Sequence, residues 1–209
     1  MKFAALKDVA EDMPTFSTRD VVTFSEQSPS SAAVHLNRWV RTGRIERLRQ
    51  GLYTLKERER RVPLTPAYLS SVLVEPSYLS GQWVLAQNSV IPEAVFTVTA
   101  ATRGRKVRFE NAYGRFAYYR LPERAWFGYV GKEFQGYYVL LARREKAMLD
   151  TIYWSGSPWD RQRFQQERVD ADNLNEGRLT RYAEKWGISK LKHSAEEFRA
   201  YKENLCPTW

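Results

Sequence analysis

Residues 30–55 have the sequence SSAAVHLNRWVRTGRIERLRQGLYTL, and this stretch decides the fold of the N-terminal part of the chain. In its first half, apolar residues recur with helical spacing as far as Gly43. Its second half has two short apolar runs separated by a turn at 49–51. The pattern predicts a helix that Gly43 closes in a left-handed conformation, followed by a β-hairpin. Five arginines against a single acid, Glu46, are typical of a surface that meets a polyanion.

Two shorter helices are expected ahead of this stretch. The first lies before Pro14, because the residue before a proline is pushed out of the helical region. Its predicted buried stripe is Phe3, Leu6, Val9, Ala10 and Met13. Ser17 and Asp20 predict the N-cap and the capping box of the second helix. Three helices and a hairpin in residues 1–61 predict a winged helix-turn-helix domain, which binds DNA by placing its third helix in the major groove.

Helical periodicity divides the third helix into two faces. The residues expected to pack inward are Ala33, Leu36, Trp39 and Val40. The candidate DNA-binding residues lie on the outer face, which also carries Val34 and Asn37, and beside the hairpin turn: Ser30, Ser31, His35, Arg38, Arg41, Arg47 and Arg49. A guanidinium can pair with guanine or with phosphate, and arginine suits the minor groove that a wing reaches. Ser30 could instead be only the N-cap, and the arginines could be ordinary solvated residues.

Residues 62–209 predict a second domain, and the charged run KERERR at 56–61 is expected to be the linker. Helical patterns occur at 66–73, 80–88, 143–154, 173–186 and 189–204, strand-like runs at 94–101, 106–110, 115–121, 126–130 and 136–141, and a loop is expected at 157–171. The predicted fold class is α+β. It consists of an N-terminal winged helix-turn-helix, then a small mixed α/β domain with an antiparallel sheet, and a C-terminal helical tail.

A second basic group is expected on a hairpin of this domain: Arg103, Arg105, Lys106 and Arg108. It could extend the DNA footprint, face RNA or an acidic partner, or be only a charged strand edge. The neighbouring aromatic residues alternate as buried strand residues do: Tyr118, Tyr119, Trp126, Phe127 and Tyr129. A base-stacking platform is the alternative interpretation of these rings.

The composition predicts a folded chain with a polyanionic partner. An apolar fraction of 43% with 14% aromatic residues can form a real core, which argues against wholesale disorder. The net charge of +9 favours nucleic acid as the partner. No apolar run approaches the roughly 20 residues of a membrane helix, and the acids near the N-terminus argue against a signal peptide, so a cytoplasmic location is expected.

Neither catalysis nor a cofactor is expected, because no catalytic triad and no phosphate-binding glycine loop is visible. Lys146 and Asp150 are interpreted as an ordinary i, i+4 helix pair rather than as part of a nuclease site. The single cysteine, Cys206, cannot form an internal disulfide. With only His35 and His193 besides, no metal site is expected.

Two segments resemble the body of AbiEi-type antitoxins: residues 90–129, VIPEAVFTVTAATRGRKVRFENAYGRFAYYRLPERAWFGY, and residues 137–154, YYVLLARREKAMLDTIYW. The most specific feature is Glu145-Lys146-Ala147 leading to Leu149-Asp150, and GRIERLRQGLY at 43–53 also fits. The similarity covers residues 1–155, and the tail fits only in its helical character. Two departures are Ser89, where a glycine usually precedes the Ile-Pro pair, and Arg143-Arg144 in the variable positions of the Glu-Lys motif.

This resemblance implies the antitoxin and transcriptional repressor of a type IV toxin–antitoxin, or abortive-infection, operon that serves phage defence. Such a protein would bind double-stranded DNA at repeats in its own promoter. It would oppose a nucleotidyltransferase-like toxin without forming a stable complex. The alternative is a winged-helix regulatory module that contacts protein or RNA and has no antitoxin activity.

Overall fold

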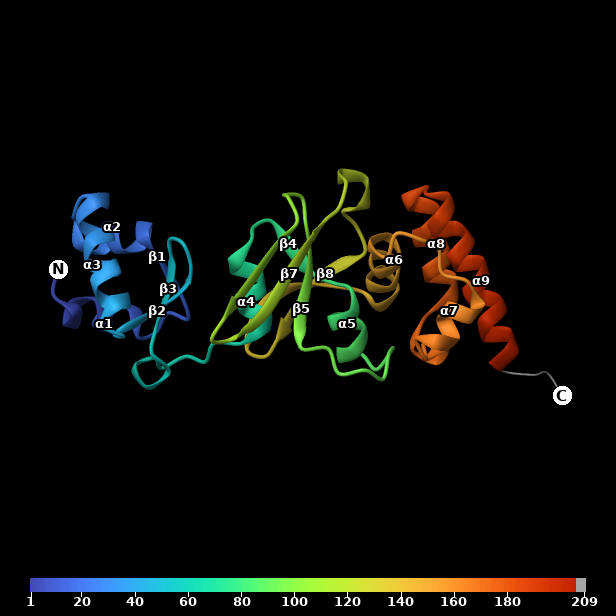
Figure 1. Cartoon of the computed structure of the whole chain (residues 1–209), viewed down its shortest axis with the longest axis horizontal. Helices are drawn as coiled ribbons and strands as arrows, with labels where there is room; N and C mark the ends of the chain where they lie inside the picture. Colours follow the sequence, from blue (N-terminus) through green and yellow to red (C-terminus); the bar gives the residue numbers. More distant parts are fainter. Residues whose placement is uncertain (206–209) are drawn as a thin grey trace. The chain divides into compact units, whose positions relative to one another are not determined.

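The computed structural model describes residues 1–205, and the chain forms two compact units, Met1–Thr65 and Pro66–Trp209 (Figure 1). The fold class is α+β, as predicted. Cys206, on which the expectation about disulfides depends, lies outside the described residues. Among residues 1–205, no helix has the length and apolar character needed to cross a membrane.

Unit 1 has the element order of a winged helix. Its elements are α1 (Phe3–Ala10), β1 (Phe16–Ser17), α2 (Thr18–Ser25), α3 (Pro29–Arg41), β2 (Ile45–Arg49), β3 (Leu52–Leu55) and the 3-10 turn η1 (Glu57–Glu59). The three strands form an antiparallel sheet in the order β1-β3-β2. The β2–β3 hairpin confirms the prediction. β1 was not predicted, because two residues are too few to show a period.

Side-chain caps fix where α2 and α3 begin. The Ser17 hydroxyl accepts from the Asp20 amide at 3.1 Å and the Asp20 carboxylate accepts from the Ser17 amide at 2.7 Å, which confirms the predicted capping box. On α3 the N-cap is Ser28, whose hydroxyl accepts from the Ser31 amide at 3.3 Å. The suggestion that Ser30 is the cap is therefore wrong, since a proline after Ser28 already occupies the first helical position.

Gly43 ends α3 as predicted. Its φ of +67° is left-handed, its amide donates to the Val40 carbonyl at 3.0 Å, and the Arg44 amide donates to the Trp39 carbonyl at 2.9 Å. This pair of bonds is a Schellman motif, which satisfies carbonyls at the helix end. It also turns the chain directly into β2.

The core of unit 1 lies between the three helices and the sheet, and is formed by Leu6, Ala10, Phe16, Val21, Ala32, Leu36, Trp39, Ile45, Tyr53 and Leu55. Two predicted core positions are wrong. Ala33 is half-buried, because the inward stripe of α3 runs through Ala32 and Trp39. Val9 is 42% exposed, because the buried side of α1 runs through Leu6 and Ala10.

The charged run at 56–61 is bound to unit 1 rather than extending as a free connector. Arg61 pairs with Glu11 at 2.8 Å and with Asp12 at 3.4 Å. Its amide also donates to the Glu11 carbonyl at 2.7 Å. These bonds attach the run to the segment after α1, and unit 1 accordingly extends to Thr65.

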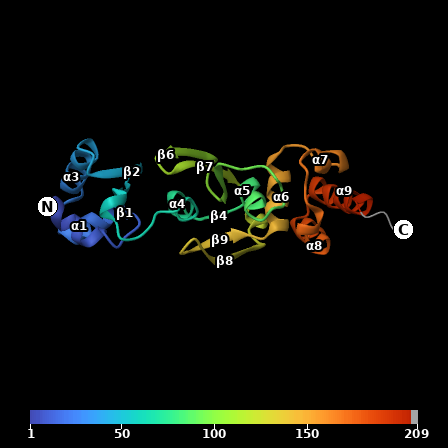
Figure 2. The same cartoon turned by 90° about the horizontal axis from the view of Figure 1, so that it is seen from below.

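Unit 2 is a six-stranded sheet with helices. Its elements are α4 (Pro66–Leu73), β4 (Ser77–Leu79), α5 (Gln82–Gln87), β5 (Thr97–Thr102), β6 (Val107–Asn111), β7 (Gly114–Arg120), η2 (Glu123–Ala125), β8 (Tyr129–Phe134), β9 (Tyr137–Ala142), α6 (Arg144–Trp154), α7 (Arg161–Gln166), η3 (Ala171–Asn173), α8 (Glu176–Trp186) and α9 (Ser189–Leu205). The strand order is β6-β7-β5-β4-β9-β8 (Figure 2). The sheet contains the expected antiparallel hairpins, but it is mixed, because the neighbour pairs β5–β7 and β4–β9 are parallel.

Three local predictions for unit 2 differ from the structure. The strand expected at 126–130 begins only at Tyr129, because η2 and Gly128, with a φ of +75°, turn the chain first. The loop expected at 157–171 contains α7, which Asp160 caps by accepting from the Arg163 amide at 2.8 Å. β4 was not predicted.

Alternate residues of β7 face opposite sides of the sheet. The Tyr118 hydroxyl donates to the Ser70 carbonyl of α4 at 2.7 Å. The Tyr119 ring stacks on Trp154 of α6, with 4.8 Å between centroids. Helix α4 therefore covers one face, and Trp154 of α6 packs on the opposite face at Tyr119.

The core of unit 2 contains an ion pair. Lys146 and Asp150 pair on α6 as predicted, but both side chains are 0% exposed, so the pair is not an ordinary surface contact. The Asp150 carboxylate also accepts from the hydroxyls of Tyr78 at 3.0 Å and Ser80 at 2.5 Å. The Lys146 ammonium lies 4.1 Å from the Trp186 ring centroid. Burial lowers the pKa of Lys146 and raises the pKa of Asp150. The contacts of this ion pair with Tyr78 and Trp186 join β4, α6 and α8 into one core.

Candidate nucleic-acid interface

The outer face of α3 is a continuous exposed surface. Ser30, Val34, Asn37 and Arg41 follow one another at helical spacing and are all exposed, and Val34 is 67% exposed. Ser31 and Arg38 are exposed beside them. The surface therefore offers hydroxyls near the start of the helix, an apolar group and an amide in the middle, and guanidinium groups toward the end.

His35 lies on α3 but is engaged within unit 1. Its ring stacks on Trp39, with 5.6 Å between centroids. Nδ1 lies 3.2 Å from a guanidinium nitrogen of Arg38, and Nε2 lies 3.4 Å from the ammonium of Met1. Burial, followed by these two positive charges, lowers the pKa of His35. The half-buried ring thus packs the helix rather than standing free on its outer face.

The wing is tied to α3 through Arg47 on β2. Its guanidinium donates to the Asn37 side-chain oxygen at 2.5 Å and lies 5.9 Å from the Tyr53 ring centroid. Arg49 donates to the Gln50 carbonyl at 3.0 Å, beside the hairpin turn. The pairing register shifts between Arg47 and Arg49, and such a bulge re-aims the strand's side chains.

Two members of this surface were not among the predicted binding residues. Asn37 and Val34 lie between the serines and the arginines of α3, and their spacing from Arg41 was the signal that could have included them. Arg44, by contrast, lies over the Phe3 ring at 5.1 Å, so it packs against α1.

The cationic groups of this surface are not neutralised by acids. Within residues 1–205, Arg38, Arg41 and Arg47 take part in no ion pair. Their contacts are to neutral groups, namely His35 and Asn37. Three uncompensated guanidinium groups on a helix and the adjoining wing can donate hydrogen bonds to phosphate oxygens.

The second basic group is exposed on unit 2, but only Arg108 lies on a hairpin, the one that β6 forms with β7. Residues 103–106 connect β5 to β6, which lie on opposite sides of β7, and Arg108 belongs to β6. Arg103 pairs with Glu123 at 2.8 Å and lies 4.6 Å from the Trp126 ring centroid. Lys106 lies 5.1 Å from the ring centroid of Tyr119, and Arg105 is exposed beside it.

The aromatic residues of this region mostly build the core. Tyr118 is fully buried, as predicted, whereas Tyr119, Trp126, Phe127 and Tyr129 are half-buried. Trp126 and Tyr129 pack on Tyr78, with centroids 5.2 and 4.5 Å apart. Among these five, Tyr119 lines an open hollow. Among residues 1–205, no cluster of three or more His, Cys, Asp or Glu could hold a metal ion.

Unit 1 is a winged helix-turn-helix domain, because an exposed third helix is followed by a two-stranded wing on the same core. Residues 5–56 of the 209 match a family model described as "Transcriptional regulator, AbiEi antitoxin". The match runs from α1 to the end of β3 and confirms the resemblance over this unit. It supports the role of a toxin–antitoxin regulator. No curated protein matches the chain.

Proposed function

We propose that the protein binds its own promoter through unit 1 and represses its operon as the antitoxin of a type IV toxin–antitoxin system. The observation that carries the DNA-binding part is the joint surface of α3 and the wing. Arg38 and Arg41 lie on the helix, and the hydrogen bond between Asn37 and Arg47 holds a wing arginine beside them.

Each part of this surface has its own role on the duplex. Helix α3 lies in the major groove, where Ser30 and Ser31 allow close approach at the helix start. Arg38 and Arg41 reach guanine edges or phosphates. Arg47 and Arg49 follow the backbone or the minor groove, where the negative potential favours arginine.

The antitoxin part of the proposal is supported by the family of the winged helix and by the resemblance of residues 90–154. The toxin it opposes is nucleotidyltransferase-like, and the two proteins form no stable complex in the cytoplasm. Co-expression with the product of the adjacent gene tests the antitoxin role directly. Relief of growth arrest supports the antitoxin role, and unrelieved arrest leaves a transcription factor only.

DNA binding is tested by a gel shift on the chain's own upstream promoter. Arg38→Ala with Arg41→Ala should weaken binding by about 1–3 kcal/mol per lost base contact, and each lost phosphate contact should flatten the salt slope by about one unit. Arg181→Ala, at an exposed arginine of α8, removes one positive charge away from unit 1 and should leave binding unchanged. If the double variant binds as the wild type does, α3 is not the helix in the groove.

One observation favours the alternative of a protein-binding winged helix. Val34 is 67% exposed on α3, and Phe24 is 42% exposed on α2. Two exposed apolar side chains on the helix-turn-helix could also meet an apolar partner. A specific band that survives about 0.1 M salt decides for DNA, because non-specific phosphate contacts weaken steeply with salt.

A further inference from the structure

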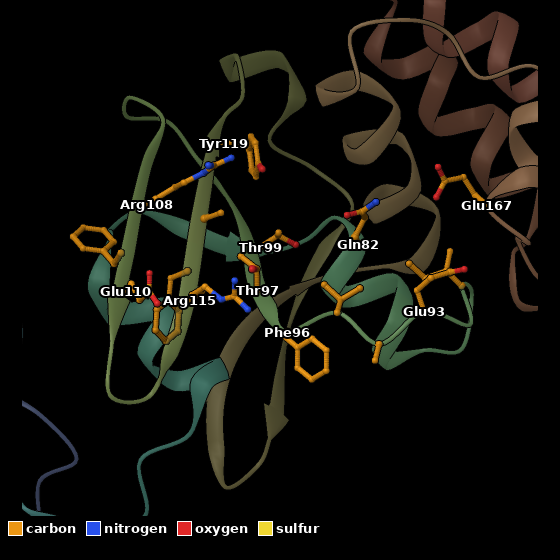
Figure 3. A pocket seen from close by; sticks show the side chains of 16 residues that line it. Gln82, Glu93, Phe96, Thr97, Thr99, Arg108, Glu110, Arg115, Tyr119 and Glu167 are labelled. Atoms are coloured by element: carbon orange, nitrogen blue, oxygen red, sulfur yellow. The ribbon is translucent and has the colours of Figure 1, made fainter.

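Unit 2 contains an open hollow of about 770 Å³ on the face of β6, β7 and β5 that looks away from α4 (Figure 3). Its size lies within the range of ligand sites in proteins, roughly 300–1,000 Å³. The functional proposal for unit 1 does not use it. The basic residues at 103–108 border it through Arg108, which is one of its lining residues.

Strand register places the lining side chains in two rows across the sheet. Glu110 of β6 is opposite Arg115 of β7, and Arg115 is opposite Thr97 of β5. One row further on, Ala117 of β7 lies between Arg108 and Thr99. Because side chains alternate along a strand, both rows face the same side. The small side chain of Ala117 forms the floor between longer neighbours.

The hollow has an excess of available positive charge. Arg108 and Arg115 are exposed, and neither forms an ion pair with any residue in the described part of the chain. Two of the acids that line the hollow are already neutralised within unit 2: Glu93 by Arg168 and Glu167 by Arg163, each at 2.5 Å. Glu110 is the remaining acid, so two guanidinium groups face one carboxylate.

Aromatic rings accompany these cations. Phe96, just before β5, is 78% exposed, although its ring is large and apolar. The Tyr119 ring lines the hollow and is supported from behind by Trp154. Figure 3 shows Phe96 near one end of the strands and Tyr119 near the other, with Arg115 and the threonines between them.

We propose that this face of unit 2 binds a segment of single-stranded nucleic acid. Arginines pair with the phosphates, and the rings of Phe96 and Tyr119 stack on bases, which is how open sheet faces hold single strands. A duplex hides the faces of its bases, so the exposed ring of Phe96 has no role on one. The site is therefore separate from the duplex-binding surface of unit 1 and does not depend on it.

The test measures fluorescence anisotropy of labelled single strands of about 12 nucleotides, a length within the usual site size. The full chain is used with Arg38→Ala and Arg41→Ala in every sample, which reduces binding by the winged helix. Separate RNA and DNA strands show which sugar is preferred. Urea unfolding of each variant verifies that the exposed substitutions leave the fold intact.

Removing an arginine and removing an acid from the hollow should change the affinity for single strands in opposite directions. Arg108→Ala together with Arg115→Ala should weaken binding about tenfold or more and lower its salt dependence, because two phosphate contacts are lost. Phe96→Ser should weaken it about fivefold or more through lost stacking. Glu110→Gln should tighten binding, since it removes the acid that repels phosphate. Arg181→Ala, which removes one positive charge outside the hollow, is the control and should have no effect.

Cross-linking of a 4-thiouridine strand to the peptides of β5 or β7 would give independent support. The proposal is overturned if the chain that carries only Arg38→Ala and Arg41→Ala binds no single strand at low salt, or if adding Arg108→Ala and Arg115→Ala leaves its binding unchanged. It is also overturned if cross-links fall only on unit 1, or if free mononucleotides compete as well as strands do. These results are independent of the gel shift on duplex promoter DNA.

Discussion

The guanidinium of Arg47 on β2 donates a hydrogen bond to the side-chain oxygen of Asn37 on α3, over 2.5 Å. Both side chains are exposed, so this contact stabilises the fold very little. Its effect is instead geometric. It fixes the direction of a wing arginine relative to the helix that enters the groove, and so the helix and the wing present one surface.

We expect Asn37→Ala and Arg47→Ala to be coupled in DNA binding. Each single variant should weaken promoter binding, and the double variant should lose less than the sum of the two, because either change alone already releases the wing arginine. The free energy of unfolding should change by less than about 0.5 kcal/mol, as is usual for exposed positions. A double-mutant cycle by gel shift measures the coupling, and strictly additive losses would show that the two residues act independently.

Val34 should read a thymine methyl group. It is 67% exposed at the middle of α3, and an apolar side chain in the major groove distinguishes thymine by its methyl. We expect Val34→Ala to lower affinity for the operator with little effect on stability. Uracil lacks this methyl group, so single thymines of the operator can be replaced by uracil one at a time. At the position that Val34 contacts, this replacement should lower the affinity of the wild type as much as Val34→Ala does. The same replacement should not change the affinity of the Val34→Ala variant. If no uracil position removes the difference, Val34 does not contact thymine.

The buried pair in unit 2 should show strong non-additivity. Asp150→Asn leaves the ammonium of Lys146 buried without an acid, and Lys146→Met leaves the carboxylate without its cation, so each should cost about 3–5 kcal/mol of unfolding free energy. The double variant should cost clearly less than the sum. Urea unfolding followed by tryptophan fluorescence is suitable, since Trp186 covers Lys146. Additive costs would contradict the pairing.

Unit 1 should lose stability as the pH falls below about 6.5. The pKa of His35 is lowered in the folded state, from the ordinary 6.5, chiefly by burial. Above 6.5 the ring is neutral in both states and the stability is complete. Below it the unfolded chain binds the proton more readily, so the unfolding free energy falls until the pH has passed the folded pKa. Thermal melts between about pH 7 and pH 5 should be flatter for His35→Asn, whereas His193→Asn should melt as the wild type does.

The parts of the fold that were predictable depend on local chemistry. The capping box at Ser17 and Asp20 and the left-handed close at Gly43 need only neighbouring residues, and both are present. α7 was missed because its one buried residue, Phe164, gives no periodicity. The parallel strand pairs were missed because pairing between distant strands leaves no mark on the residues of either strand.

The candidate sites, too, were predictable only where they depend on residues close together in the sequence. Periodicity separated the outer residues of α3 from Leu36 and Trp39, but it could not reveal that His35 stacks on Trp39. Lys146 and Asp150 are spaced as any surface pair would be, and only the tertiary fold buries them. The hollow around Ala117 arises from three strands in register, which spacing along one strand does not contain.

Trp186 covers the ammonium of Lys146 from a helix that lies far along the chain from α6. A fragment that stops after α6 would open that ammonium to water and lose the ring above it, so the sheet and α8 must be kept together. Experiments that divide the chain to find which part opposes the toxin therefore have one natural cut, between Thr65 and Pro66. Loss of activity in a C-terminally shortened chain would report misfolding of unit 2 and not the position of the active segment.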